Sequence, residues 1–246
     1  MKNILVIGAT SGIGRELCLK YAGMGYKVAA TGRRVELLAS LKLAQPDLIY
    51  TYTNDVTQCK AQELIKQISA DLGGLDIIVI SSGFGDINFF LESEVEFKTV
   101  NTNVLGFTDW ADAGYKLLSS QFKESGRKGV LAGLSSIASF RGSDAAPAYF
   151  ASKAYVSNYL QGLRKKAIKD KEDVSIVTII PGFVDTALGK GVGGKGLFWV
   201  APVGKAARQI ISAVDKKKKV AYITKRWRLM AWVLKLAPDF IYNRTY

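Results

Sequence analysis

The sequence predicts an α/β protein built around one doubly wound parallel sheet. Short apolar runs rich in β-branched residues recur along the chain, and most are continuous rather than alternating, as in strands buried on both faces. Longer segments with helical periodicity lie between them, so strand and helix alternate. The chain has 246 residues, of which 48% are hydrophobic, and this is enough to bury the core of such a sheet.

Each apolar run is taken as a strand, and each periodic segment between two runs as a helix. The predicted strands span Asn3–Ile7, Lys27–Thr31, Leu48–Thr53, Asp76–Ile80, Gly129–Leu134, Val174–Ile180 and Val220–Ile223. The predicted helices span Gly12–Met24, Val35–Leu43, Thr57–Leu72, Asn103–Lys123, Ala148–Lys169 and Val203–Val214. Crossovers of this kind are right-handed. Since no Pro/Ser-rich linker and no repeat interrupts the alternation, a single domain is expected over residues 1–225, followed by a C-terminal extension over 226–246.

The first predicted strand runs into a glycine-rich turn that opens the first helix. This turn, Gly8–Gly14, has the sequence GATSGIG. Its glycines let the backbone turn tightly and approach a pyrophosphate, and the following helix N-terminus offers unpaired N–H groups. A purely structural turn is the alternative, because many turns contain glycine. The strand–turn–helix context in the first loop of the sheet favours dinucleotide binding.

The end of the second predicted strand indicates which dinucleotide is bound. It reads Thr31-Gly32-Arg33-Arg34, and the next acidic residue is Glu36. In NAD-binding proteins an acid at this point accepts hydrogen bonds from the adenosine ribose. A guanidinium instead binds a 2′-phosphate, which an acid would repel. The sequence therefore predicts NADP, with NAD less favoured. The alternative is that the two arginines only begin a solvated helix.

A tyrosine and a lysine one helical turn apart predict a site of proton transfer. Tyr149 and Lys153 have the spacing i, i+4, which places them on one helix face. A lysine cation near a phenol favours the phenolate and lowers its pKa from the reference value of about 10. Ser136 ends a predicted strand at the carboxyl edge, where open α/β sheets bind ligands. A chance surface pair is the alternative for Tyr149 and Lys153 alone.

The composition excludes several kinds of catalytic site. The chain has no histidine, which excludes a Ser-His-Asp triad, a Cys-His dyad and His-ligated metal sites. The two cysteines, Cys18 and Cys59, do not form a Cys-x-x-Cys pair. No metal site and no disulfide framework are therefore expected, and reduced thiols are typical of a cytoplasmic protein.

The chain is strongly basic, and much of the excess lies near the C-terminus. Lys and Arg number 34 and Asp and Glu 21, which gives a net charge of +13. Residues 216–238 contain no acid, and their basic residues are Lys216, Lys217, Lys218, Lys219, Lys225, Arg226, Arg228 and Lys235. Such a charge favours anionic partners. Nucleic-acid binding is not expected, because no recognisable motif accompanies the charge.

The extension over residues 226–246 mixes basic and aromatic residues, and two placements stay open. A helix here can lie on an anionic membrane at the inner surface of the cell, with tryptophans at the interface. It can also pack over the substrate pocket or on a partner subunit, which the apolar area of Trp227, Trp232 and Phe240 favours slightly. Its apolar run is too short to span a bilayer.

Together these motifs resemble the short-chain dehydrogenase/reductase family, and the resemblance covers residues 1–222 approximately. The glycine turn is similar to the family's Thr-Gly-x-x-x-Gly-x-Gly, with Ile7 in place of the threonine. Asp55-Val56 resembles the pair after the third strand that contacts adenine. The segment Pro181–Thr186 resembles the one that touches the nicotinamide and its phosphate.

The resemblance implies a Rossmann-like fold and assigns roles to individual residues. The implied catalytic tetrad is Asn103, Ser136, Tyr149 and Lys153. In the reducing direction Tyr149 would give the proton, Ser136 would hold the carbonyl oxygen, Lys153 would bind the nicotinamide ribose, and Asn103 would support a water. The implied cofactor contacts are Gly8, Thr10, Ser11, Gly12, Ile13, Gly14, Arg33, Arg34, Asp55, Val56, Ser82, Gly83, Tyr149, Lys153, Pro181, Gly182, Val184 and Thr186. One departure is Ile80–Gly83, which reads Ile-Ser-Ser-Gly where the family has Asn-Asn-Ala-Gly.

The expected function is that of an NADP(H)-dependent oxidoreductase acting on a small-molecule carbonyl or alcohol. Apolar and aromatic residues near the motifs indicate a hydrophobic substrate, and they are Phe84, Phe140, Phe183, Leu197, Phe198 and Trp199. Packing of these side chains in the core is the alternative. A second function, an NADP-binding sensor without turnover, also stays open. A homodimer or homotetramer is what the family resemblance implies.

Overall fold

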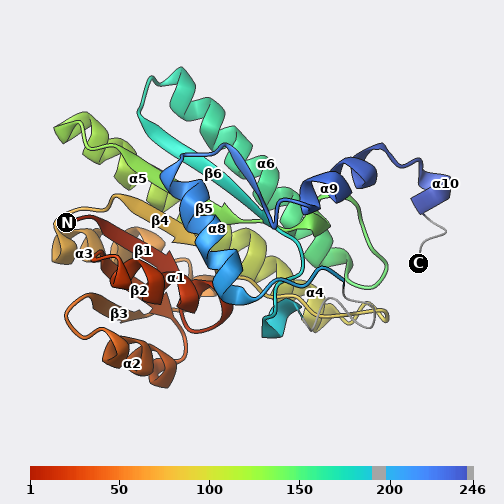
Figure 1. The fold of residues 1–246 in the computed structure, drawn as a ribbon, viewed down its shortest axis with the longest axis horizontal. Helices are drawn as coiled ribbons and strands as arrows, with labels where there is room; N and C mark the ends of the chain where they lie inside the picture. Colours follow the sequence, from red (N-terminus) through yellow and green to blue (C-terminus); the bar gives the residue numbers. More distant parts are fainter. Residues whose placement is uncertain (190–197, 243–246) are drawn as a thin grey trace.

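The computed structural model describes residues 1–189 and 198–242, and for Ile241 it describes the backbone only. Seven parallel strands form one sheet in the order β3-β2-β1-β4-β5-β6-β7 (Figure 1). The strands span β1 Asn3–Ile7, β2 Lys27–Gly32, β3 Ile49–Thr53, β4 Ile77–Ile80, β5 Gly129–Leu134, β6 Val174–Pro181 and β7 Val220–Ile223. The predicted doubly wound sheet is therefore confirmed, and each predicted strand lies within two residues of an observed one.

Helices cover both faces of this sheet (Figure 1). The helices that connect or follow the strands span α1 Gly12–Gly23, α2 Val35–Ala44, α3 Ala61–Leu72, α4 Ser93–Val100, α5 Gly106–Ser125, α6 Pro147–Lys169, α8 Val203–Asp215, α9 Trp227–Leu236 and α10 Asp239–Tyr242. Alternate residues of β1 enter opposite cores. Ile4 and Val6 pack with α1, α2 and α8, whereas Leu5 and Ile7 pack with α3, α5 and α6. Burial on both faces explains the continuous apolar strands.

Two predicted helices differ from the structure. The segment predicted as one helix over Thr57–Leu72 begins with a 3-10 turn, η1 (Val56–Gln58), and Cys59 then takes a left-handed conformation with φ 50° before α3 starts. The helix predicted from Asn103 starts earlier, because α4 and a π-helical turn, η2 (Asn101–Leu105), lead directly into α5. Helix α4 was missed because Thr99 is its only buried residue, so it carries no apolar stripe.

The parallel sheet fixes where the chemistry lies. All strands end at the same edge, and the strand order reverses at β1, which has β2 on one side and β4 on the other. Open α/β sheets bind ligands in the crevice outside this reversal. A further 3-10 turn, η3 (Ile137–Phe140), follows β5 at the same edge.

Strand β7 divides the basic C-terminal segment into two groups. It runs parallel to β6, with Val220 opposite Thr178 and Ile223 opposite Pro181. Lys216–Lys219 therefore lie at the amino edge of the sheet, and Lys225–Lys235 lie at the carboxyl edge beside the ligand crevice. The charge that is contiguous in sequence does not form one patch.

The last helices pack against the domain. Trp227 and Ala231 of α9 are buried in a cluster with Ile137, and the aromatic ring of Phe183 packs edge-on against Trp227 with centroids 5.3 Å apart. Among residues 1–189 and 198–242, no helix is both long and apolar enough to cross a membrane.

Candidate active site

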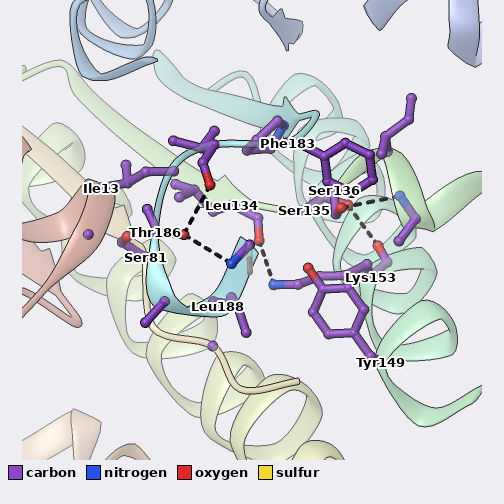
Figure 2. Close-up of a pocket in the computed structure, with 18 of the residues that line it drawn as sticks. Ile13, Ser81, Leu134, Ser135, Ser136, Tyr149, Lys153, Phe183, Thr186 and Leu188 are labelled. Atoms are coloured by element: carbon purple, nitrogen blue, oxygen red, sulfur yellow. Dashed lines mark hydrogen bonds between the residues drawn. The ribbon is translucent and has the colours of Figure 1, made fainter. Parts of the chain in front are cut away.

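A cavity of about 680 Å³ opens at the carboxyl edge of the sheet. It extends from the glycine turn after β1, past the ends of β4 and β5, to helix α9. Figure 2 shows Ser136, Tyr149 and Lys153 on one side of this space and Ile13 and Ser81 on another. The cavity brings together the glycine turn, the arginines after β2 and the tyrosine and lysine of α6, which are far apart in sequence.

The glycine turn has the shape expected for close approach of a ligand. Gly8 and Gly12 have φ of +85° and +54°, which only glycine adopts without strain. A Cβ on Gly8 would come within 2.6 Å of the backbone nitrogen of Ser82. Gly14 does not line the cavity. A Cβ there would collide with the carbonyl oxygen of Gly8, so this glycine serves the packing of α1 against the turn.

Two buried polar groups in the cavity wall support binding of a polar ligand beside the turn. The Ser82 hydroxyl and the Asn54 side-chain amide nitrogen have no hydrogen-bond partner among the residues that the structure describes. A buried polar group without a partner costs about 1–3 kcal/mol, so its presence in a cavity wall points to a ligand that satisfies it. Together with the glycine cradle, these residues fit the pyrophosphate and ribose hydroxyls of a dinucleotide.

The two arginines after β2 have different surroundings. Arg34 donates hydrogen bonds to the Thr10 hydroxyl at 2.7 Å and to the Ser11 hydroxyl at 2.8 Å, and so ties β2 to the glycine turn. Arg33 is 62% exposed and lies 3.6 Å from the Asp55 carboxylate. Both arginines line the cavity. They place positive charge at this end of the cavity, where no carboxylate of the described residues lines the wall.

Of the two residues predicted to follow β3 at the cofactor site, Asp55 and Val56, only Val56 lines the cavity. The Asp55 carboxylate turns toward η1 and accepts hydrogen bonds from the backbone nitrogen and hydroxyl of Thr57. Hydrogen bonds from Thr57 and the charge of Arg33 hold the pKa of Asp55 below its usual value, despite partial burial. Asp55, which was predicted to contact the cofactor, therefore does not line the cavity, and it is linked to the cavity wall through its ion pair with Arg33.

Ser136, Tyr149 and Lys153 converge at the end of β5. The Lys153 ammonium donates a hydrogen bond to the Leu134 carbonyl oxygen at 3.1 Å and lies 5.6 Å from the centroid of the Tyr149 ring (Figure 2). Ser136 caps η3 by accepting a hydrogen bond from the backbone nitrogen of Ala138 at 3.2 Å. All three side chains line the cavity, so the predicted catalytic serine, tyrosine and lysine are brought together.

Burial shifts the ionisation of this group. It raises the pKa of Tyr149, and a hydrogen bond with Ser136 lowers that pKa in part. It lowers the pKa of Lys153 to about 8, since a buried ammonium loses its hydration. The expectation that Lys153 is the group that lowers the pKa of Tyr149 differs from this finding. Ser136 has that effect in the structure.

Asn103 lies behind the cavity wall rather than in it. Its side-chain oxygen accepts a hydrogen bond from the backbone nitrogen of Phe84 at 2.8 Å, and its amide nitrogen donates to the Phe84 carbonyl and to the Ser152 hydroxyl. Ser152 in turn donates to the carbonyl oxygen of Tyr149 at 2.7 Å. The π-helical turn η2 carries Asn103, which ties the segment after β4 to helix α6.

The segment after β6 closes the cavity between the two halves of the sheet. Pro181, Gly182, Val184 and Thr186 all line it, as predicted. The Thr186 hydroxyl accepts a hydrogen bond from the backbone nitrogen of Gly189 at 3.1 Å, which curls the segment back toward the glycine turn (Figure 2).

The wall beyond Tyr149 is mostly apolar. Of the apolar and aromatic residues expected there, Phe183 and Phe198 line the cavity, whereas Phe84, Phe140 and Trp199 do not. Leu197 lies outside the described residues. Further residues of this wall were not predicted individually from the sequence, and they are Ile87, Phe89, Phe150, Met230, Leu234 and Tyr242. A signal for part of them existed in the sequence, since Trp227, Met230 and Leu234 have helical spacing.

Comparisons with known proteins identify relatives along most of the chain. A family model described as short chain dehydrogenase matches residues 2–195. An uncharacterized oxidoreductase of Myxococcus xanthus is 36% identical over 193 residues, 76% of this chain and 74% of that protein. Hydroxysteroid 11-beta-dehydrogenase 1-like protein A of Xenopus laevis is 25% identical over 242 residues, 95% of this chain and 81% of that protein.

Solved structures share the fold at low sequence identity. A structure titled ElxO with NADP bound has a TM-score of 0.76 at 23% identity and covers 90% of this chain and 96% of its own. A short-chain dehydrogenase from Sphingobium yanoikuyae in complex with NADPH also has a TM-score of 0.76, at 20% identity, with 94% and 92% covered. These likenesses support the architecture.

Proposed function

The chain belongs to the short-chain dehydrogenase/reductase family of oxidoreductases, and from this premise we propose that it is an NADP(H)-dependent enzyme. It would interconvert a carbonyl compound and the corresponding alcohol. The observation that carries the proposal is the convergence of Ser136, Tyr149 and Lys153 in a cavity that continues to the glycine turn. Proton-transfer groups and a dinucleotide cradle share one space.

Residues of this chain provide a place for the cofactor along the whole cavity. The backbone of the glycine turn would hold the pyrophosphate, Arg33 would face the 2′-phosphate, and Arg34 would hold the turn in place beside it. Ser82 and Asn54 would supply the hydrogen bonds that the family's asparagines otherwise make, because both are buried and unpaired among the described residues. The nicotinamide supplies the hydride when the cofactor is bound. The two NADP-bound relatives support the choice of NADP.

The chain's own residues would handle the proton and the orientation of the substrate. In the reducing direction, the Tyr149 hydroxyl gives its proton to the carbonyl oxygen, and the Ser136 hydroxyl holds the same oxygen by a hydrogen bond. The Lys153 ammonium lies 5.6 Å from the centroid of the Tyr149 ring, and it would bind the ribose hydroxyls of the nicotinamide half, as the family resemblance implies. We assign Asn103 as a positioning residue, because it contacts Phe84 and Ser152 rather than the cavity.

The substrate is proposed to be a small hydrophobic carbonyl or alcohol. Ile137, Phe150, Phe183, Met230 and Leu234 surround the space beyond Tyr149. Burial of apolar surface, at roughly 25 cal/mol per Å², would supply most of the binding free energy there. Polar groups of the substrate would be confined to the end near Ser136 and Tyr149.

Replacement of Tyr149 by phenylalanine tests the proposal. We expect Tyr149→Phe to reduce NADPH-dependent turnover of a panel of apolar ketones and aldehydes by about 10²–10⁴-fold, because the proton donor is lost. Binding of NADPH, measured by its fluorescence, should stay within about twofold because the ring remains. The matched control is Tyr159→Phe on the same helix, which packs in the core away from the cavity and should leave turnover unchanged.

Three outcomes would contradict the proposal. Retained turnover in Tyr149→Phe would remove this residue from the mechanism. NADPH binding by the parent protein without oxidation by any compound of the panel would favour the sensor without turnover. Equal affinity of the parent for NADPH and NADH would overturn the choice of cofactor.

Assembly and location complete the proposal. A homodimer or homotetramer stays a prediction that rests on the family, and a cytoplasmic location stays a prediction that rests on the reduced cysteines. Sedimentation velocity of the purified chain and fractionation of its host cells would test them.

A further inference from the structure

Helix α9 has a second apolar face that points away from the domain. Its side chains, here called the outer stripe, are Leu229, Trp232, Val233 and Leu236, and the exposed Phe240 of the separate short helix α10 is included with them. They are exposed by 68%, 58%, 53%, 73% and 66%, respectively. We propose that the outer stripe docks on the surface of an anionic lipid bilayer. The helix would lie in the plane of that surface.

The outer stripe is not needed to attach α9 to the domain. Trp227 and Ala231, on the opposite face of the helix, are almost fully buried, at 2% and 0% exposure. Arg141 fixes the end of the helix, since it donates hydrogen bonds to the carbonyl oxygens of Leu234 and Ala237 and pairs with Asp239 at 2.7 Å. The helix is thus held from inside while a row of large apolar side chains faces outward. Such an exposed row marks an interaction surface.

Cations border the outer stripe and select the kind of partner. Lys225, Arg226, Arg228 and Lys235 are all exposed, and the segment from Lys225 to Pro238 contains no acidic residue. The first acid, Asp239, is already paired with Arg141. An amphipathic helix with tryptophan and leucine on one face and flanking cations binds an anionic membrane surface, where apolar side chains enter the headgroup boundary.

The same charge disfavours a second copy of this chain as the occupant. In a two-fold symmetric contact, each outer stripe would face its own copy. The cations of both helices would then lie close together, and like charges across an interface cost free energy. An anionic bilayer instead satisfies both the apolar row and the cations around it.

The position of α9 gives such docking a consequence, which rests on the proposed function. The inner face of the same helix contributes Trp227, Met230 and Leu234 to the apolar end of the cavity. Phe89 also lines the cavity and is 62% exposed, and the following Phe90 is 90% exposed. Docking of the outer stripe would therefore leave only the thickness of helix α9 between the bilayer and the apolar end of the cavity.

Vesicle binding tests the proposal without measuring turnover. Purified full-length protein is mixed with vesicles of phosphatidylcholine and phosphatidylglycerol at 3:1, or of phosphatidylcholine alone, and sedimented. We expect binding to the anionic vesicles only, weakened as salt rises, because screening shortens the range of the attraction. Trp232→Glu should reduce binding at least tenfold. Its fold is checked by circular dichroism and by thermal unfolding.

The two basic groups separated by β7 provide a matched control for charge. Lys225→Gln with Arg228→Gln, beside the outer stripe, should lower the vesicle partition coefficient by about 30-fold. Lys216→Gln with Lys218→Gln removes the same charge at the opposite edge of the sheet and should change it less than about threefold. If the partition coefficient fell equally in the two double variants, net charge alone would explain vesicle binding. That result would overturn docking through α9.

Three further results would overturn the proposal. The first is the absence of binding to anionic vesicles, and the second is vesicle binding by Trp232→Glu equal to that of the parent. The third is a dimer of the parent that Trp232→Glu dissociates, observed by sedimentation velocity together with no vesicle binding. That result would assign the outer stripe to contact between copies of the chain. None of these readouts depends on turnover, so they are distinguishable from a failure of the proposed enzyme activity.

Discussion

Arg33 and Arg34 are adjacent in the sequence but make different contacts, so we expect them to have different roles. The Arg34 guanidinium is engaged by the Thr10 and Ser11 hydroxyls, so it holds the glycine turn against β2. The Arg33 side chain is largely exposed and lies at 3.6 Å from Asp55, a weak pair that a phosphate can displace. Cofactor choice should therefore depend on Arg33, and the shape of the cradle on Arg34.

Replacing each arginine by alanine separates these tasks. We expect Arg33→Ala to weaken NADPH by about tenfold and leave NADH nearly unchanged, because only the contact to the 2′-phosphate is lost. Arg34→Ala should weaken both cofactors, because the turn loses its hydrogen bonds to β2. Fluorescence titration with both cofactors measures this. A parallel loss of NADPH and NADH in Arg33→Ala would show that this residue does not read the phosphate.

Burial of Lys153 affects the stability of the fold as well as the proposed active site. Burial lowers its pKa from 10.5 to about 8. Between these two pH values the unfolded chain binds more protons than the folded chain, so the free energy of unfolding rises with pH in this window. Below pH about 8 the cost of burying the ammonium is present in full.

We expect Lys153→Met to abolish turnover and yet to stabilise the fold at neutral pH. The pKa shift corresponds to about 3 kcal/mol, of which loss of the hydrogen bond to the Leu134 carbonyl offsets about 1 kcal/mol. The gain at pH 7 should be about 2 kcal/mol and should be mostly lost by pH 10. Urea unfolding at both pH values checks this. A gain independent of pH would mean that packing, not charge burial, is responsible.

At the scale of residues, the sequence predicted the glycine turn and the tyrosine–lysine pair that line the cavity, but not the contacts between the segments that carry them. Glycines after a first strand and a tyrosine–lysine pair on a helix are local patterns, and the cavity contains them. The contacts of Asn103 with Phe84 and Ser152 join three separate segments. No local pattern encodes such contacts, because they depend on where α5 and α6 cross the sheet edge.

For helix α9 the sequence left two placements open, on a membrane or over the substrate pocket. The structure shows that its two faces differ in burial. The residues at Trp227, Met230 and Leu234 face the cavity, as expected of a lid, while the outer stripe carries the features expected of a membrane-facing helix. Periodicity alone could not separate the two placements, because apolar residues occupy both faces. The buried face, with Trp227 and Ala231, is the one that attaches the helix to the domain.

Trp227 and Trp232 allow the two faces of α9 to be compared by the same substitution. Trp227 is 2% exposed and Trp232 is 58% exposed. We expect Trp227→Ala to lower the free energy of unfolding by about 3 kcal/mol, since a buried indole leaves a cavity. Trp232→Ala should change it by less than about 0.5 kcal/mol. Denaturant unfolding of both variants measures this, and equal effects would contradict the assignment of the inner face.

At the scale of the whole molecule, the parallel sheet places different features at the carboxyl ends and at the amino ends of its strands. Its carboxyl edge gathers the glycine turn, Arg33, Ser136 and α9, whereas Lys216–Lys219 lie at the amino edge. Alternation of strands and helices was sufficient to predict this architecture. The sequence could not reveal that the basic segment is split, because that depends on β7 joining the sheet parallel to β6.

The boundary predicted between residues 1–225 and the extension after it can be tested by truncation after Lys225. Removal of α9 and α10 uncovers Ile137 and Phe183 and opens the apolar end of the cavity. The dinucleotide cradle lies at the other end, around Gly8 and Arg34. We therefore expect the truncated chain to bind NADPH within about threefold of the parent and to be about 3 kcal/mol or more less stable.

The truncated chain should also lose turnover of apolar substrates, because their wall is gone while the Tyr149 hydroxyl remains. Fluorescence titration, urea unfolding and a substrate panel measure the three properties on one sample. The matched control is a chain ended after Tyr242, which keeps α9 and α10 and should behave as the parent. A truncated chain that fails to bind NADPH would show that the cradle needs α9 to fold. One with full stability and an unchanged substrate range would show that α9 is not part of the cavity wall in solution.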